Sequence, residues 1–145
     1  MIKHKGAFGI IDVSTPVVHH VDDDPQGKPL VIDLPLPPSV NRTSGLRLGN
    51  EHPKVKQWRR HADAHLIYTR QSKHLRAIEG PVCLDIWWDT QVLGDVDNRI
   101  KHLLDYLQRL RIVTDDSQCR RLVAEFGIAP DGCRVRVQPW HWQPD

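Results

Sequence analysis

Two pairs of aspartates fall within 22 residues of this chain, a spaced pair, Asp95 and Asp97, and an adjacent pair, Asp115 and Asp116. Two carboxylates about 4 Å apart repel by roughly 4 kcal/mol at an effective dielectric near 20. A divalent cation removes that penalty, and oxygen-only ligands suit Mg²⁺ or Mn²⁺, which bind a few carboxylates and complete their shell with water and phosphate. The two aspartate pairs therefore predict a divalent-metal site.

A lysine one helical turn after the first pair could complete this site. Apolar residues recur at helical spacing and predict a helix over about residues 98–110, which Asp97 or Asn98 could cap. Lys101 lies four residues after Asp97, so its ammonium can turn back toward the acidic pair. Taken alone, Asp95-Val96-Asp97-Asn98 could be a helix cap and Asp115-Asp116 a turn. Their combination with Lys101 favours catalysis.

The elements that must position these residues can be inferred from the rest of the pattern. Apolar residues alternate over 82–89 and predict a strand that leads to Asp95, with both of its tryptophans expected in the core. A first strand is expected at 30–34, ended by three prolines, and a long helix begins at Pro53. Residues 121–126 and 134–138, separated by Pro130-Asp131-Gly132, are expected to form a hairpin. This order predicts an α+β fold, a mixed β-sheet with helices packed on one face.

The acidic block resembles the signature of a known family. The segments Gly94-Asp95-Val96-Asp97-Asn98-Arg99-Ile100-Lys101 and Asp115-Asp116-Ser117-Gln118 resemble the RusA family of Holliday junction resolvases. Leu34–Asn41 is similar to the opening strand and loop of that family, and the resemblance spans roughly Leu30 to Pro139. It implies that Asp95, Asp97 and Asp116 are catalytic aspartates, Lys101 the catalytic lysine and Asp115 an accessory acid. His102 departs from the family, where proline is frequent.

The resemblance also implies a function. It implies a Mg²⁺-dependent endonuclease, with Mn²⁺ as a substitute, that resolves four-way DNA junctions in recombination and repair. A four-way junction is two-fold symmetric, so a homodimer is expected. The surface that joins the two subunits could lie on the strand around residues 82–88 or on the strand around residues 135–137. The alternatives are a non-catalytic protein that binds branched DNA and a metal-dependent phosphohydrolase acting on small substrates.

The charge distribution suggests where DNA binds. Residues 54–76 contain seven basic residues and one acidic residue, whereas residues 77–145 contain eight basic and eleven acidic residues. Next to a metal site, such a basic segment favours phosphate binding over a merely solvated helix face. The expected DNA contacts are two polar loop residues and five basic residues: Asn41, Arg42, Lys56, Arg59, Arg60, Arg70 and Lys73.

Composition limits the remaining possibilities. At 145 residues and 39% hydrophobic residues, with no apolar run long enough to span a bilayer, the chain is expected to be one globular domain without a membrane segment. We expect an N-terminal extension over 1–29, partly flexible, an endonuclease domain over 30–140 and a tail over 141–145. The three cysteines have no paired spacing and predict free thiols. A cytoplasmic protein of a bacterium or prophage is expected.

Overall fold

The computed structural model describes residues 27–40 and 51–141. Most of the expected N-terminal extension and all but the first residue of the expected tail lie outside these ranges. The elements in chain order are β1 (Leu30–Pro35), α1 (Pro53–Tyr68), the short 3-10 helix η3 (Gln71–His74), β2 (Val82–Asp89), α2 (Ile100–Arg109), the short 3-10 helix η4 (Asp116–Gln118), β3 (Cys119–Gly127) and β4 (Gly132–Pro139). No helix in the described part of the chain is long and apolar enough to cross a membrane.

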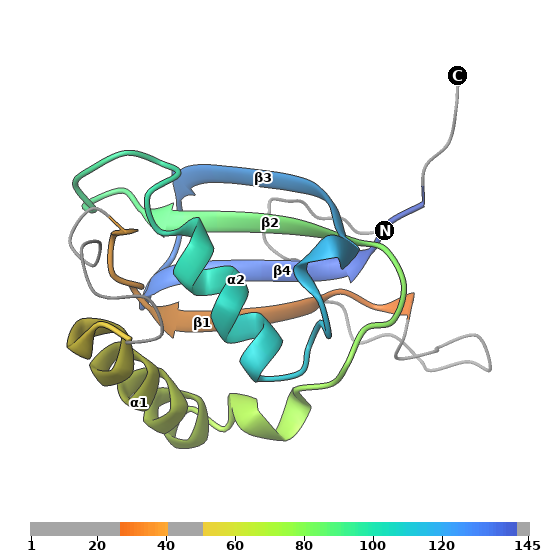
Figure 1. Ribbon diagram of the computed structural model, residues 1–145, viewed down its shortest axis with the longest axis horizontal. Helices are drawn as coiled ribbons and strands as arrows, with labels where there is room; N and C mark the ends of the chain where they lie inside the picture. The colour runs from red at the N-terminus through yellow and green to blue at the C-terminus, as the bar shows by residue number, and fades with distance from the viewer. Residues whose placement is uncertain (1–26, 41–50, 142–145) are drawn as a thin grey trace, which may run out of the picture.

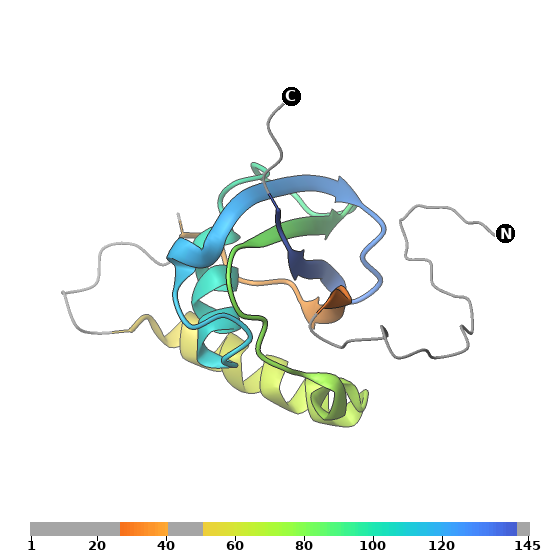
Figure 2. The same cartoon turned by 90° about the vertical axis from the view of Figure 1, so that its right-hand side faces the viewer.

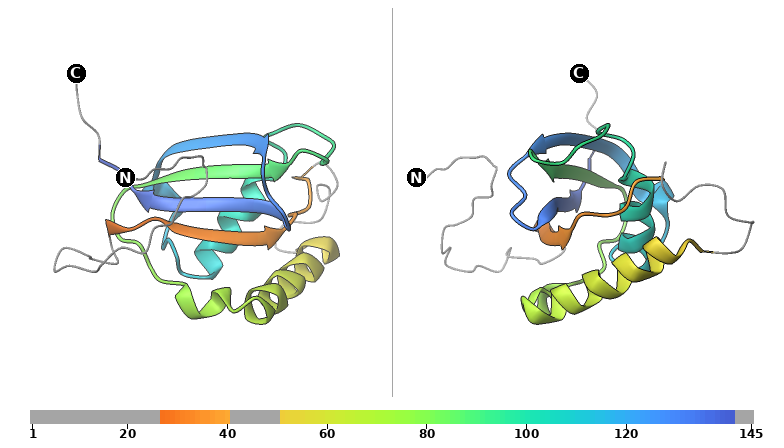
Figure 3. Two further views of the ribbon diagram at one scale, coloured as in Figure 1. Left: turned by 180° about the vertical axis from the view of Figure 1, so that it is seen from behind. Right: turned by 90° about the vertical axis from the view of Figure 1, so that its left-hand side faces the viewer.

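The four strands form one mixed sheet in the order β1-β4-β2-β3 (Figure 1). β3 runs parallel to β2, and β4 runs antiparallel to both β1 and β2. α2 lies across one face of the sheet and α1 lies beside β1, on the same side (Figure 2). From behind, the strands lie in front of α2 (Figure 3). The predicted α+β fold with a mixed sheet is confirmed.

The predicted hairpin between the last two strands is wrong. β3 and β4 flank β2 on opposite sides, so residues 128–131 pass over the end of β2. The side chains agree with these positions. Every second residue of β4, from Cys133 to Val137, has an exposed fraction of 0%, as expected of a strand between two others, whereas β3 carries charged, exposed residues. The turn signal at Pro130-Asp131-Gly132 was correct, but it does not specify which strand β4 pairs with.

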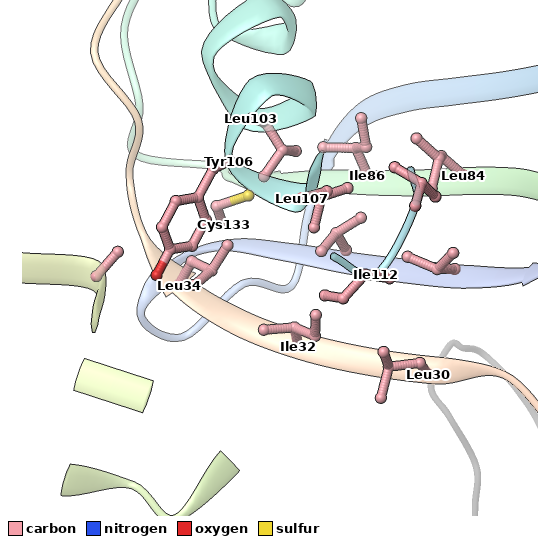
Figure 4. Packing of buried hydrophobic residues seen from close by; sticks show 14 of the residues in the cluster. Leu30, Ile32, Leu34, Leu84, Ile86, Leu103, Tyr106, Leu107, Ile112 and Cys133 are labelled. Carbon is pink, nitrogen blue, oxygen red and sulfur yellow. The ribbon is translucent and has the colours of Figure 1, made fainter. Parts of the chain in front are cut away.

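The core lies between the sheet and the two helices (Figure 4). α2 presents Leu103, Tyr106 and Leu107 to alternate residues of the strands, among them Ile32 and Ile86. Burying a side chain of this size contributes about 1.5–3 kcal/mol, so the α2 stripe alone fixes this helix on the sheet. Trp58 of α1 packs edge-on against Tyr106, with ring centroids 4.9 Å apart. Both helices thus share one core.

The outer face of the sheet is polar. Asp33 accepts hydrogen bonds from Arg134, its direct partner on β4, at 2.6 Å, and Asp85 accepts from Arg136 at 2.9 Å. Trp88 is buried in the core as predicted, but Trp87 lies on the outer face, where the Arg136 guanidinium sits 5.5 Å from its ring centroid.

The β1 edge of the sheet is closed by a side chain. The backbone N–H of Asp33 donates to Gln71 Oε1 at 2.7 Å, and Gln71 Nε2 donates to the carbonyl of Asp33 at 2.9 Å. The amide of Gln71 therefore occupies the two backbone groups that an added strand would need at this position.

Candidate active site

The first acidic pair lies in the turn between β2 and α2. Asp95 and Asp97 are exposed, and Val96 between them is half-buried. The carbonyl of Val96 accepts a hydrogen bond from the indole of Trp88 at 2.7 Å. Gly94 precedes the pair with φ of 109°, in the region that favours glycine. A tryptophan of the core thus holds the turn from inside, while the two carboxylates point outward.

The proline-rich loop after β1 supports the same turn. The N–H of Val40 donates to the carbonyl of Asn98 at 2.8 Å, and the Arg99 guanidinium donates to the carbonyl of Pro37. Two segments that are about 60 residues apart in the sequence, Pro35–Val40 and 94–101, therefore form one unit. α2 itself begins at Ile100 with Arg99 as its N-cap residue and without a side-chain cap, so neither Asp97 nor Asn98 has the expected capping role.

The second acidic pair begins η4. Asp115 caps this short helix and accepts from the backbone N–H of Ser117 at 3.3 Å and from its hydroxyl at 2.8 Å. These hydrogen bonds lower the pKa of the Asp115 carboxyl. Gln118 anchors η4 by donating to the carbonyls of Ile78 and Gly80, each at 2.9 Å. Asp115 therefore has a structural role, whereas Asp116 is exposed at the start of the helix.

One chain does not bring the two acidic pairs together. The turn carrying Asp95 and Asp97 is tied to Trp88, near the end of β2, whereas η4 is tied to Gly80, just before its start. β2 has eight residues, roughly 23 Å at about 3.3 Å per residue. In Figure 1, α2 begins at the arrowhead end of β2 and η4 lies at the opposite end of the sheet. Within residues 27–40 and 51–141, no three Asp, Glu, His or Cys side chains are grouped to hold a metal ion. The expected convergence of four carboxylates in one subunit is absent from this part of the chain.

Lys101 also differs from the expectation. Its Nζ donates to Asp105 Oδ2 at 3.2 Å, one turn further along α2, and no described ion pair joins it to Asp97. Both partners are exposed, with relative side-chain areas of 70% and 57%. A pair this open contributes little to stability, about 0.3–0.5 kcal/mol for this helical spacing, so the Lys101 ammonium is easily redirected.

A cleft of about 330 Å³ separates the start of α1 from the outer side of α2, and Lys101 lines it. On α2 the cleft is lined by Lys101, Asp105 and Arg109, at successive four-residue steps, and by His102 and Tyr106 beside them. Burial lowers the pKa of His102. Sequence reasoning missed Arg109 and His52, which also line the cleft; the four-residue spacing from Lys101 was the available signal for Arg109.

The predicted DNA-binding residues that the structure describes are spread along α1 and the η3 segment after it. Lys56, Arg60, Arg70 and Lys73 are exposed. Arg59 is half-buried and forms an ion pair with Glu51, one bond of which measures 2.7 Å, so its guanidinium already has a carboxylate partner. α1 has sixteen residues, about 24 Å at 1.5 Å per residue, so Lys56 lies near the cleft and Arg70 at the far end. Asn41 and Arg42 lie outside the described residues.

Comparison with known protein families identifies the family to which this chain belongs. The family described as Endodeoxyribonuclease RusA matches residues 35–138, from the last residue of β1 to the penultimate residue of β4. The chain belongs to the RusA family. It is therefore an endodeoxyribonuclease and Holliday junction resolvase, and branched DNA is the substrate that this family implies. A search of curated proteins found no match to the chain.

The RusA match covers both acidic pairs, Lys101 and α1. The two strands expected to form a dimer surface do not offer these apolar side chains to a partner. Val82, Val135 and Val137 each have an exposed fraction of 0% within a single subunit.

Proposed function

We propose that this RusA-family protein is a Mg²⁺-dependent homodimer that resolves four-way junctions by paired strand cleavage, with each active site shared between two subunits. The observation that carries the proposal is the separation of the two acidic pairs to opposite ends of β2. Asp95 and Asp97 of one subunit, together with Asp116 of the partner subunit, supply the oxygen ligands that Mg²⁺ prefers.

The carboxylate oxygens that the two subunits would provide fit a divalent cation. Asp95 and Asp97 lie exposed on either side of half-buried Val96, and the turn is held by hydrogen bonds that do not involve the outer carboxylate oxygens of Asp97. A second subunit that contributes Asp116 raises the number of carboxylates from two to three. A bound Mg²⁺ would supply positive charge against the scissile phosphate and lower the pKa of a bound water that attacks it.

Lys101 would stabilise the negative charge that grows on the phosphate as the bond breaks. It lies one residue after the start of α2 and lines the cleft beside α1, so a DNA backbone in that cleft would meet its ammonium. Its exposed ion pair with Asp105 would exchange for a contact with phosphate. Asp115, whose carboxylate caps η4, would position Asp116 in an accessory role.

The basic residues of α1 would hold the arms of the junction. Lys56 and Arg60 are near the cleft, and Arg70 and Lys73 extend the positive surface away from it. Asn41 and Arg42, which follow Val40 in the sequence, are proposed as further DNA contacts. Contacts of this kind are sequence-independent and depend on salt concentration.

Complementation between two inactive variants tests the shared site. Asp97→Asn and Asp116→Asn subunits are each expected to be inactive on a synthetic four-way junction with Mg²⁺. A heterodimer of the two has one site with both lesions and one intact site, since the intact site takes Asp97 from one subunit and Asp116 from the other. Co-refolded mixtures should therefore recover about half of the wild-type activity per heterodimer, and only with Mg²⁺ present.

If each chain held its own complete site, every site in the mixture would carry one lesion and no activity would return. Asp97→Asn mixed with itself is the matched control. The non-catalytic alternative predicts that the wild-type protein binds the junction but leaves it uncut at all Mg²⁺ concentrations.

A further inference from the structure

β3 is an edge strand whose outer side pairs with no strand in the described part of the chain. The opposite edge of the sheet, β1, is closed by Gln71. Exposed apolar residues gather around the β3 end of the molecule: Leu93 is 86% exposed, Phe126 40% and Ile128 75%. An open edge strand with apolar surface beside it is a template for pairing with another strand.

The sequence of β3 is complementary to itself in one antiparallel register. Arg121, Val123 and Glu125 point to the outer face of the sheet, as do their β2 partners Cys83, Asp85 and Trp87. If two copies of β3 pair antiparallel about Val123, Arg121 of each lies directly opposite Glu125 of the other, and the two valines face each other. Moving the centre by one residue to Leu122 or Ala124 removes both charge pairs. Opposite charges at directly facing positions stabilise strand pairing, and like charges oppose it.

The same register brings the acidic pairs together. η4 precedes the first residue of β3, and the turn with Asp95 and Asp97 follows the end of β2, the parallel neighbour of β3. Antiparallel pairing places the start of β3 beside the end of the other copy's β3, and the end of that copy's β2 is one strand further on. Strands are about 4.8 Å apart, so Asp116 comes within roughly 10 Å, in the sheet plane, of the strand that leads to Asp95 of the second copy.

From these observations we infer that the sheet of one subunit continues into a second copy of this chain through antiparallel β3 pairing centred on Val123. The inference rests on the proposed function for its view that two subunits share a site, and it adds the surface that joins them. The interface formed by the two paired β3 strands, here called the β3 seam, contains two copies of the Arg121–Glu125 pair. It unites four strands from each subunit in one sheet.

Charge reversal tests the pairing without any measurement of cleavage. Arg121→Glu and Glu125→Arg each place like charges opposite one another twice, so each homodimer should dissociate about tenfold or more readily in analytical ultracentrifugation. Mixing the two variants makes every facing pair opposite in charge and should restore the wild-type dimer affinity. Arg60→Glu, an exposed charge reversal on α1, is the control and should leave the dimer affinity unchanged.

A disulfide tests the register. At facing positions of an antiparallel pair the Cα atoms are about 4.5–5.5 Å apart, within the range for a disulfide. Val123→Cys, in a Cys119→Ser background, should form a covalent dimer within minutes of mild oxidation, and Ala64→Cys on α1 should not. Circular dichroism melts confirm that the variants are folded.

Three outcomes separate this inference from the shared site. A dimer that keeps its affinity in both charge variants and forms no Val123→Cys disulfide overturns the β3 seam but leaves the shared site standing. A protein that stays monomeric while it cleaves junctions overturns both. Complementation failure together with a confirmed seam overturns the shared site alone.

Discussion

Asp95 and Asp97 are attached to the fold through the residue between them. The Val96 carbonyl, not a carboxylate, accepts from the buried Trp88, and the N–H of Ile100 reaches the backbone carbonyl of Asp97 at 3.4 Å. The backbone of this turn is therefore held independently of the Asp97 carboxylate, and the Asp95 carboxylate adds only a long hydrogen bond from the Asn98 amide at 3.5 Å. Changes to the carboxylates alone should alter chemistry and leave the fold unchanged.

Asp97→Asn should abolish cleavage and leave junction binding intact. Asparagine keeps the volume of the side chain but supplies no anionic ligand, and removal of a negative charge facing phosphate does not weaken binding. Cleavage of a labelled junction and gel-shift binding without Mg²⁺ measure the two properties. Asp131→Asn, at an exposed aspartate outside both acidic pairs, should cleave normally. Full activity of Asp97→Asn at ordinary Mg²⁺ would remove this residue from the site.

The Lys101–Asp105 ion pair leads to a second prediction, about the rate of cleavage. Lys101→Ala should lower the cleavage rate severely, with a smaller loss of binding, because its charge acts mainly in the transition state. Asp105→Ala frees the same ammonium and should leave the rate constant at wild-type level or above it. Single-turnover kinetics at saturating protein separates rate from affinity. An equal loss in both variants would show that the pair itself, and not the lysine, is needed.

The contact between α1 and α2 forms the floor of the cleft that Lys101 lines. Tyr106 Oη donates to Asp63 Oδ1 at 2.6 Å, and Trp58, which packs on Tyr106, donates from its indole to the carbonyl of Pro35 at 3.0 Å. Burial, followed by the hydrogen bond to Asp63, raises the pKa of Tyr106. This interface ties both helices to the end of β1.

The raised pKa makes stability fall at alkaline pH. Folded Tyr106 keeps its proton above pH 10, whereas the unfolded chain loses it near the ordinary tyrosine value of about 10. Its contribution to stability is therefore complete below pH 10 and decreases as the pH rises further. Tyr106→Phe should be less stable at pH 8 by about 1 kcal/mol, and its melting temperature should fall less between pH 9.5 and 11. Tyr68→Phe, at a tyrosine that is 88% exposed, should keep the wild-type pH dependence.

Two neighbouring arginines on α1 should differ in their effect on DNA binding. Arg60 is exposed, whereas Arg59 is paired with Glu51. Arg60→Gln should lower the slope of log affinity against log salt concentration by about one unit, the loss of one phosphate contact, and Arg59→Gln should change it less. Junction titrations at several salt concentrations measure both slopes. Identical wild-type slopes in the two variants would mean that α1 is only a solvated face.

The sequence predicted elements better than their pairing. Alternation and helical spacing located the four strands, α2 and the start of α1 to within about two residues, because these patterns reflect burial along one segment. The partner of β4 depends on interactions across the whole sheet, and the turn before it fits either neighbour. One signal was available: β2 and β3 are joined through α2, and such a crossover usually connects parallel strands. That would have placed Asp115 and Asp116 at the opposite end of the sheet from Asp95.

For the whole molecule, two sites per dimer predict the product of a mixed population. A heterodimer of wild-type and Asp97→Asn subunits keeps one functional site, because the wild-type Asp97 still meets an intact Asp116 of the partner subunit. On a supercoiled plasmid with an extruded cruciform it should therefore make one nick and yield open circles. Agarose gels at a 1:1 ratio, compared with wild type alone, measure the shift from linear to open-circular product. Mixtures that give only linear or uncut plasmid would contradict paired sites.

The side-chain clamp of Gln71 on Asp33 decides how far such an assembly can grow. A subunit with two open sheet edges can add further copies without limit, as a bifunctional monomer does in a polymer. A subunit with one open edge stops at the dimer, as a monofunctional monomer does. Among the described strands, β1 is occupied by Gln71 at Asp33, which leaves β3 as the open edge, and pairing of two copies uses that edge in both. One glutamine thus acts as a chain terminator, and a variant such as Gln71→Val would restore the second functional end and permit growth beyond the dimer.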